Sequence, residues 1–224
     1  MLLAIDTATS WTGLALHDGE AIVAEWGWRA GNKQTTELAP AVKQLLGQVA
    51  AAATSIQAVA VALGPGSYTG LRIGLGFAKG LALANQIPLI GVPTLDILAA
   101  SVGELPGRLL LAAEAGRTRV CVAVYQWQKR QGWQTTQRSE NLTWEELLTK
   151  IGEAEAGPLY FAGEIAPGAA RLIRNRSKQF HLLAAANNPR RAGFLADLAW
   201  HRFRKNQTDD PASLTPIYLR DPGT

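Results

Sequence analysis

The chain has few residues that bind metals or form disulfides: one cysteine and three histidines among 224 residues. A single cysteine excludes an internal disulfide, and Cys121, within the apolar run RVCVAVY, is expected to be a small strand residue rather than a nucleophile or a ligand. His17, His181 and His201 lie far apart in sequence, and no His-x-x-x-His pair is present. We therefore predict no metal site and no cofactor.

Long apolar runs are also missing. No stretch approaches the roughly 18 uninterrupted apolar residues of a membrane-spanning helix. The first residues, MLLAIDTATS, lack the basic region that opens a secretory signal. We therefore expect a cytoplasmic protein, and a hydrophobic content of 47% is enough to build a core.

Acidic residues are scarce in one segment of a chain whose net charge is +4. Residues 171–205 hold nine Lys or Arg and one acid, Asp197, an excess of +8 that leaves −4 for the rest. A solvated outer face of two helices is the simpler interpretation of this segment. Contact with an acidic or RNA partner is the alternative, although no RNA-binding motif occurs there.

Hydrophobic periodicity predicts the same order of elements twice. The first half reads as strands LLAID, GLALH and AIVAEWGW, a helix over 36–52 behind a Thr cap, a strand over 56–63, a helix ending near Asn85, strand PLIGV, and a helix from Thr94. The second half reads as strands RLLLAA, RVCVAVYQW and WQTTQ, a helix over 143–151 opened by a Thr-x-x-Glu capping box, strand PLYFAG, helix PGAARLIRNR, strand HLL, and a last helix behind Asn188-Pro189.

Each half is therefore βββαβαβα. Two halves with one element order indicate a duplicated α/β architecture. We expect two lobes, residues 1–105 and 106–224, joined at the Glu-Leu-Pro-Gly of 104–107.

Five glycines occur within GPGSYTGLRIGLG (64–76), directly after a predicted buried strand. A Walker phosphate loop would need Lys followed by Ser or Thr after its last glycine, but Leu-Arg follows Gly70. A dinucleotide-binding loop would need glycine where Thr69 stands. A nucleophile elbow would need glycines two residues before and after Ser67, where Pro65 and Thr69 stand. Ser67 is therefore predicted to cap the following helix.

The helix after this turn is small and apolar nearly all round. Two rows of small residues recur in it at helical spacing: Gly70, Gly74, Ala78 and Ala82 in one, and Gly76, Gly80 and Ala84 in the other. Each interior glycine costs about 1 kcal/mol relative to alanine. Such a helix is expected to be packed closely on more than one side, either within the chain or against a second protein.

The repeated unit resembles the two-lobed actin-like (ASKHA) fold of actin, sugar kinases and chaperone ATPases. Four segments together resemble the bacterial TsaB family, also called YeaZ: LLAIDTATS, VALGPGSYTGLRIGLGFAKGLA, IPLIGVPTLDILA and PIYLR. The resemblance covers essentially the whole chain and is densest over residues 1–102. In the second half the sequence departs from the family, because Glu114-Ala-Gly-Arg stands where the family often has Asp-Ala-Arg.

The resemblance implies a non-catalytic paralogue of the enzyme TsaD. Together with TsaD and the ATPase TsaE, such a protein supports the transfer of threonylcarbamoyl to the adenosine next to the anticodon of tRNAs. It implies a TsaD-like partner, a TsaE-like ATPase acting through the complex, indirect contact with tRNA, and a homodimer when the partner is absent. The residues expected at the partner interface are Leu38, Val42, Leu45, Gly70, Leu71, Gly74, Leu75, Ala78 and Ala82.

An ATP-hydrolysing member of the actin-like superfamily would clamp phosphates between two turns, one in each lobe. The first turn here contains Asp6, Thr7 and Thr9, which could be a remnant of such a phosphate loop, although hydrogen bonding to its own backbone is the simpler interpretation of Asp6. The second turn, residues 113–117, has no Asp-Gly pair. We therefore predict a subunit without catalytic residues of its own. The alternatives are an active ATP-dependent kinase or hydrolase, and a self-associating protease-like regulator.

Overall fold

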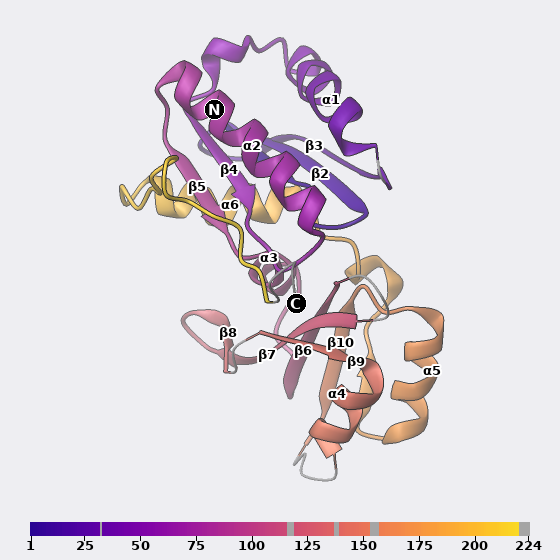
Figure 1. Cartoon of the computed structure of the whole chain (residues 1–224). Coiled ribbons are helices and arrows are strands. Elements are labelled where there is room, and N and C mark those ends of the chain that lie inside the picture. The colour runs from indigo at the N-terminus through magenta and orange to yellow at the C-terminus, as the bar shows by residue number, and fades with distance from the viewer. Residues whose placement is uncertain (32, 116–118, 137–138, 153–156, 220–224) are drawn as a thin grey trace. The chain divides into compact units, whose positions relative to one another are not determined.

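The computed structural model describes residues 1–219 except 32, 116–118, 137–138 and 153–156 (Figure 1). The chain forms two compact units, one made of Met1–Ile97 with Arg191–Tyr218 and the other containing Leu98–Arg190. Part of the predicted second turn, residues 116–117, lies outside the described residues.

The first unit is built on a five-stranded sheet in the order β3-β2-β1-β4-β5. β1–β2 and β2–β3 are antiparallel, and β4 runs parallel to both β1 and β5. Its elements are β1 (Leu2–Asp6), β2 (Trp11–His17), β3 (Ile22–Arg29), α1 (Gln34–Gln48), β4 (Ala58–Ala62), α2 (Tyr68–Asn85), β5 (Leu89–Val92) and α6 (Ala192–Phe203), with α3 (Thr94–Ala100) at the boundary with the second unit.

Both faces of this sheet are covered. α1 and α2 pack on one face, where Leu3 and Ile5 of β1 contribute to the core, and α6 packs on the other, where Leu2 and Ala4 do. The alternation follows from the two-residue period of a strand. Every residue of β1 and β4 is buried, which explains why β4 and the first four residues of β1 are continuous apolar runs.

The second unit contains a six-stranded sheet in which β11-β10-β6-β7-β8 form the main order and β9 pairs with β7. Its elements are β6 (Arg108–Glu114), β7 (Arg119–Gln128), β8 (Gly132–Thr135), β9 (Glu140–Thr143), α4 (Trp144–Ile151), β10 (Leu159–Gly163), α5 (Pro167–Arg176) and β11 (Phe180–Leu182). Leu110, Phe161 and Ile173 lie at the centre of a core that α4 and α5 help to cover.

The predicted α/β architecture and element order are confirmed, with two local differences. The short strand β9 was not predicted. α1 begins at Gln34 with Lys33 as its N-cap and no side-chain cap, and the Thr36 hydroxyl instead donates to the Lys33 carbonyl. The capping box of α4 is present, since Thr143 Oγ1 accepts from Glu146 N and the Glu146 carboxylate accepts from Thr143 N.

The predicted lobe boundary at 105/106 differs from the observed units. The last helix, expected in the lobe 106–224, belongs to the first unit. Leu195, Ala196 and Ala199 of α6 are buried against the sheet face that α1 and α2 leave open. The position of α6 is therefore determined by the burial of its apolar residues on the uncovered face of the sheet. It is not determined by the place of α6 in the sequence.

Within the described part of the chain, no helix combines the length and apolar character needed to span a bilayer.

Candidate functional site

The loop after β1 is closed by contacts within the first unit. Asp6 is fully buried, and its Oδ1 accepts a hydrogen bond from Ala8 N at 2.9 Å, which confirms the turn interpretation of this residue. Thr7 Oγ1 donates to the Gly70 carbonyl at 2.7 Å, and Thr9 Oγ1 accepts from Trp11 N. Buried side chains held in this way support the loop and the start of α2 instead of presenting an open phosphate turn.

The glycine-rich turn fixes the start of α2 against the same loop. Ser67 is the N-cap of α2, its side chain accepts from Gly70 N, and its own N–H donates to the Ala8 carbonyl at 2.6 Å. A Cβ at position 70 would lie 2.2 Å from the Thr7 carbonyl oxygen, and one at position 74 would lie 2.2 Å from Thr7 Oγ1. These two glycines are required because the loop approaches the helix more closely than any side chain permits.

The residues predicted at a partner interface all lie within the first unit and are buried there, so their contact with a partner stays a prediction. The apolar side chains among them pack into the cores around the unit's own sheet, while Gly70 and Gly74 face Thr7 in the loop after β1. The predicted residues are Leu38, Val42, Leu45, Gly70, Leu71, Gly74, Leu75, Ala78 and Ala82, and all are buried.

In the part of the chain that the structure describes, the opposite side of α2 is open. We define its outer face as the exposed residues that recur along this side of the helix, Tyr68, Arg72, Gly76, Gly80, Leu83 and Ala84. Apart from the adjacent residues and backbone of α2 itself, a Cβ added at Gly76 or Gly80 would meet no atom of the described residues within 4 Å. Leu83 is 66% exposed, and the Arg72 guanidinium lies over the Tyr68 ring, 5.2 Å from its centroid. The second small row of the sequence is therefore the accessible one.

The surroundings of Cys121, His17 and His201 indicate structural rather than catalytic roles. Burial raises the pKa of the Cys121 thiol to about 11, so it is protonated at neutral pH and a poor nucleophile. His17 and His201, which are far apart in sequence, both place Nε2 3.9 Å from Asp197 Oδ1. No group of three or more His, Cys, Asp or Glu side chains in the described ranges could hold a metal ion.

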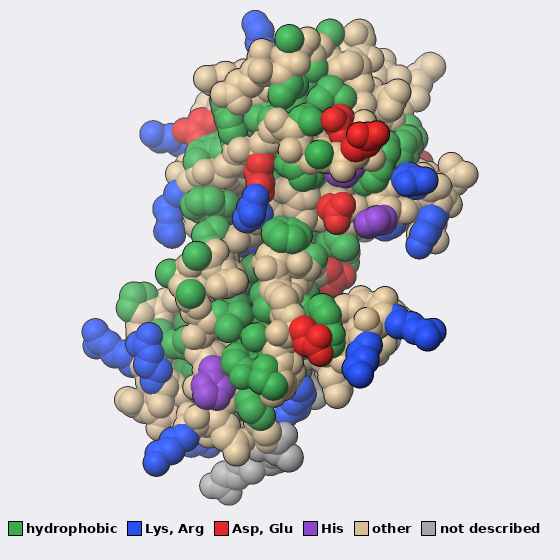
Figure 2. Space-filling model, turned by 180° about the vertical axis from the view of Figure 1, so that it is seen from behind, with side chains coloured by type: hydrophobic (Ala, Val, Ile, Leu, Met, Phe, Trp, Pro, Cys, Tyr) green, Lys and Arg blue, Asp and Glu red, His purple; other side chains and the backbone are tan. Residues whose placement is uncertain are grey.

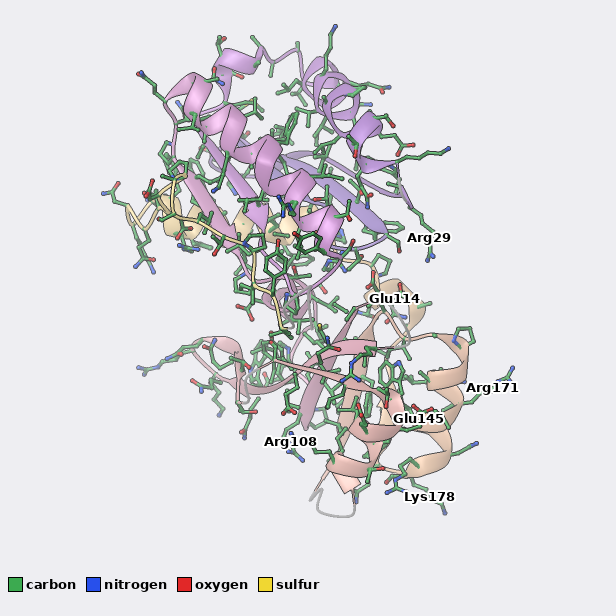
Figure 3. The ribbon with its side chains drawn as sticks, viewed as in Figure 1. Arg29, Arg108, Glu114, Glu145, Arg171 and Lys178 are labelled. Atoms are coloured by element: carbon green, nitrogen blue, oxygen red, sulfur yellow. The ribbon has the colours of Figure 1, made fainter. Side chains whose placement is uncertain are left out.

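The basic segment 171–205 is divided between the two units, with residues 171–190 in the second and 191–205 in the first. Arg171, Arg174, Arg176 and Lys178 are exposed on or just after α5 in the second unit, and Figure 3 shows Arg171 and Lys178 pointing outward. Three other arginines form ion pairs: Arg190 with Glu164, Arg191 with Glu25, and Arg202 with Asp209. On the side of each unit that Figure 2 shows, Lys and Arg side chains are spread out rather than gathered in one patch. Contact of this segment with RNA stays a prediction.

The two mixed sheets and the repeated element order define the class, an actin-like α/β protein. The ethanolamine utilization protein EutJ from Carboxydothermus hydrogenoformans shares this fold, with a TM-score of 0.50, 13% identity, and coverage of 87% of this chain and 88% of that chain.

The family follows from closer relatives. The family model described as "TsaD: tRNA N6-adenosine threonylcarbamoyltransferase" matches residues 29–144. The tRNA threonylcarbamoyladenosine biosynthesis protein TsaB of Bacillus subtilis (strain 168) is 31% identical over 221 residues, covering 98% of this chain and 93% of the relative. The structure of YeaZ from Pseudomonas aeruginosa matches with a TM-score of 0.77 and 28% identity, covering 97% and 99% of the two chains. The chain belongs to the TsaB (YeaZ) family.

Proposed function

We propose that this chain is a non-catalytic subunit of tRNA threonylcarbamoyladenosine biosynthesis, and that it binds and stabilises a TsaD-like catalytic partner. The partner docks on the outer face of α2. The resulting complex contacts a TsaE-like ATPase and tRNA, and it acts in the cytoplasm. When the partner is absent, a second copy of this chain occupies the outer face of α2. Membership of a family whose named relatives belong to this pathway supports the reaction assigned.

Exposed glycines within a helix are the observation that carries the docking proposal. Gly76 and Gly80 lie inside α2, and each destabilises the helix by about 0.5–1 kcal/mol relative to alanine. No contact among the described residues requires either glycine, because the space beside both is open. Small residues let a second helix approach to the ~8–10 Å of close packing. The close approach of a partner helix therefore explains why α2 has glycine at these two positions, although both glycines destabilise the isolated chain.

The absence of a catalytic role is supported by what the polar residues near the glycine-rich turn do. The Asp6 carboxylate binds its own loop, the Ser67 hydroxyl caps α2, and the Thr7 hydroxyl joins the two. Each of these groups is therefore committed to holding the first unit together. The transfer reaction is accordingly assigned to the partner.

The docking proposal is tested with Gly80→Arg in the full chain. The isolated variant should fold as the wild type does, because the side chain enters open space on a helix that gains propensity. Its affinity for the TsaD-like partner should fall at least about a hundredfold, since a buried and unpaired cation would separate the helices. Threonylcarbamoyl transfer by the reconstituted proteins should fall with it, and this chain without the partner should form no product.

Gly103→Arg is the matched control, because position 103 is also exposed and a Cβ there also meets no atom within 4 Å, but it lies outside α2. It should leave partner affinity and transfer unchanged. Wild-type affinity in the Gly80→Arg variant would contradict docking on the outer face. Product formation by this chain alone, at a rate that scales with its concentration, would contradict the non-catalytic assignment.

A further inference from the structure

The second unit contains a pocket that plays no part in the proposed docking. It has a volume of about 490 Å³ and lies among the end of β6, β7, and the first turns of α4 and α5. This volume is within the range of roughly 300–1,000 Å³ that is typical of sites for small organic ligands. Its walls are mainly apolar, with Val120, Trp144, Ala169 and Leu172 among the residues that line it.

Two of the charged groups in the pocket are already paired. Arg119 donates to the Asn141 side chain and carbonyl, and its Nη2 lies 3.6 Å from Glu146 Oε2. Glu164 Oε2 accepts from the backbone N–H of Glu114, and its Oε1 lies 3.5 Å from the buried guanidinium of Arg190. The charges of Arg119 and Glu164 are therefore largely balanced within the unit.

Two carboxylates are left without such a partner. Glu114 at the end of β6 and Glu145 in the first turn of α4 both line the pocket, and both are exposed (Figure 3). Neither side chain forms a hydrogen bond or an ion pair with another described residue. The pocket therefore combines two available negative charges with a mainly apolar lining to which Trp144 contributes.

We propose that this pocket binds a guanidinium or ammonium group carried on an apolar stem. Glu114 and Glu145 attract the cation, and the stem lies against Leu172. The cation also lies near the face of Trp144, where, once desolvated, it gains a further favourable interaction with the ring. Long basic side chains have this chemistry, with an apolar stem and a charged end. The group can come from a free alkylamine or alkylguanidine, or from a Lys or Arg side chain of another protein.

The test uses three small probes of one size on the full chain. They are n-butylguanidinium, the neutral isostere n-butylurea, and the anion pentanoate. Binding is followed by NMR at the Trp144 indole N–H, which is assigned by its loss in Trp144→Phe. We expect n-butylguanidinium to bind with a Kd of about 1 mM, as its few atoms allow. The urea should bind at least about tenfold more weakly, and pentanoate should not bind.

The combined variant Glu114→Gln and Glu145→Gln should remove this preference, so that the guanidinium and the urea bind with similar affinity. Both positions are exposed, so the variant should retain its fold, which its melting temperature checks. Glu104→Gln, an exposed carboxylate outside the pocket, should keep the preference. If the peptide acetyl-Gly-Arg-Gly-amide binds more tightly than n-butylguanidinium, the natural ligand is a side chain of another protein. If the peptide binds more weakly, the natural ligand is a free alkylamine or alkylguanidine.

Three results would overturn the proposal. They are equal binding of the guanidinium and the urea by the wild type, an unchanged preference in the double variant, and tighter binding of pentanoate than of the cation. The last would mean that Arg119 and the uncapped first turn of α5 determine the charge that the pocket accepts.

Discussion

The two sides of α2 carry similar residues in opposite surroundings. On the inner side, Gly74 faces Thr7 so closely that an added Cβ would be 2.2 Å from a side-chain atom, and Leu75 is 6% exposed. On the outer side, Gly80 faces open space and Leu83 is 66% exposed. The inner glycine is explained by the fold of this chain. The fold does not explain the outer glycine. The contrast distinguishes residues that folding requires from residues that are available to a partner.

The largest expected effect is that of Gly74→Arg. The side chain would collide with Thr7 and place an unpaired cation in the core, which should cost about 4 kcal/mol or more, a large part of the stability of a typical domain. The isolated variant should be unfolded or should melt far below the wild type by circular dichroism. Gly80→Arg is its matched partner and should melt like the wild type. Cooperative, wild-type melting of Gly74→Arg would show that the inner side is accessible.

Alanine at the same two positions should change stability in opposite directions. Gly74→Ala should lose about 1–3 kcal/mol, because the Thr7 hydroxyl, which donates to the Gly70 carbonyl, must move to admit one methyl group. Gly80→Ala should gain about 0.5–1 kcal/mol, because it adds helix propensity without a steric conflict. Urea unfolding of the isolated chain measures both. Changes of the same sign at the two positions would remove the distinction between the two sides.

A smaller effect is expected from a second pair of one buried and one exposed residue, His17 and His201, whose Nε2 atoms both lie 3.9 Å from Asp197 Oδ1. His17 Nδ1 accepts from Gly19 N at 2.9 Å, its ring stacks on Trp200, and burial holds the pKa of His17 below its ordinary value. The unfolded chain therefore binds this proton near pH 6.5 while the native chain resists it. The stability that neutral His17 contributes is complete above about pH 6.5 and is lost as the pH falls toward the lower native pKa.

This pH effect is measured by urea unfolding at pH 7.5 and at pH 5.5. The wild type should lose more stability between the two pH values than His17→Asn, in which the amide oxygen can still accept from Gly19 N. His201→Asn should behave like the wild type, because this side chain is 69% exposed. An identical loss in the wild type and in His17→Asn would show that another group causes the pH dependence.

Most of the fold could be predicted because its signals are local. β4 is apolar along its whole length, and β1 is apolar up to Asp6, since both faces of these strands are covered. β9 was missed because it is only four residues long, Glu140–Thr143, and all of these except Leu142 are polar, so that it shows no strand pattern. The position of α6 could not be predicted from order along the chain, because it depends on a sheet face formed more than 100 residues earlier.

The side of α2 that faces the sheet could not be predicted for a similar reason. Both rows of small residues satisfy helical spacing, and only the approach of Thr7, 63 residues before Gly70, selects the inner one. In the same way, sequence spacing did not reveal that His17 and His201 share Asp197. The glycine-rich turn was easier to interpret, because the failure of every phosphate-loop pattern left helix capping by Ser67, which the structure confirms.

The affinity of the TsaD-like partner for the variant Gly76→Ala and Gly80→Ala tests most directly whether the outer glycines are kept open for docking. The isolated variant should be more stable than the wild type. We predict that it nevertheless binds the partner about tenfold or more weakly by titration calorimetry, because the two methyl groups hold the helices apart. Unchanged or tighter binding by this more stable variant would contradict the account.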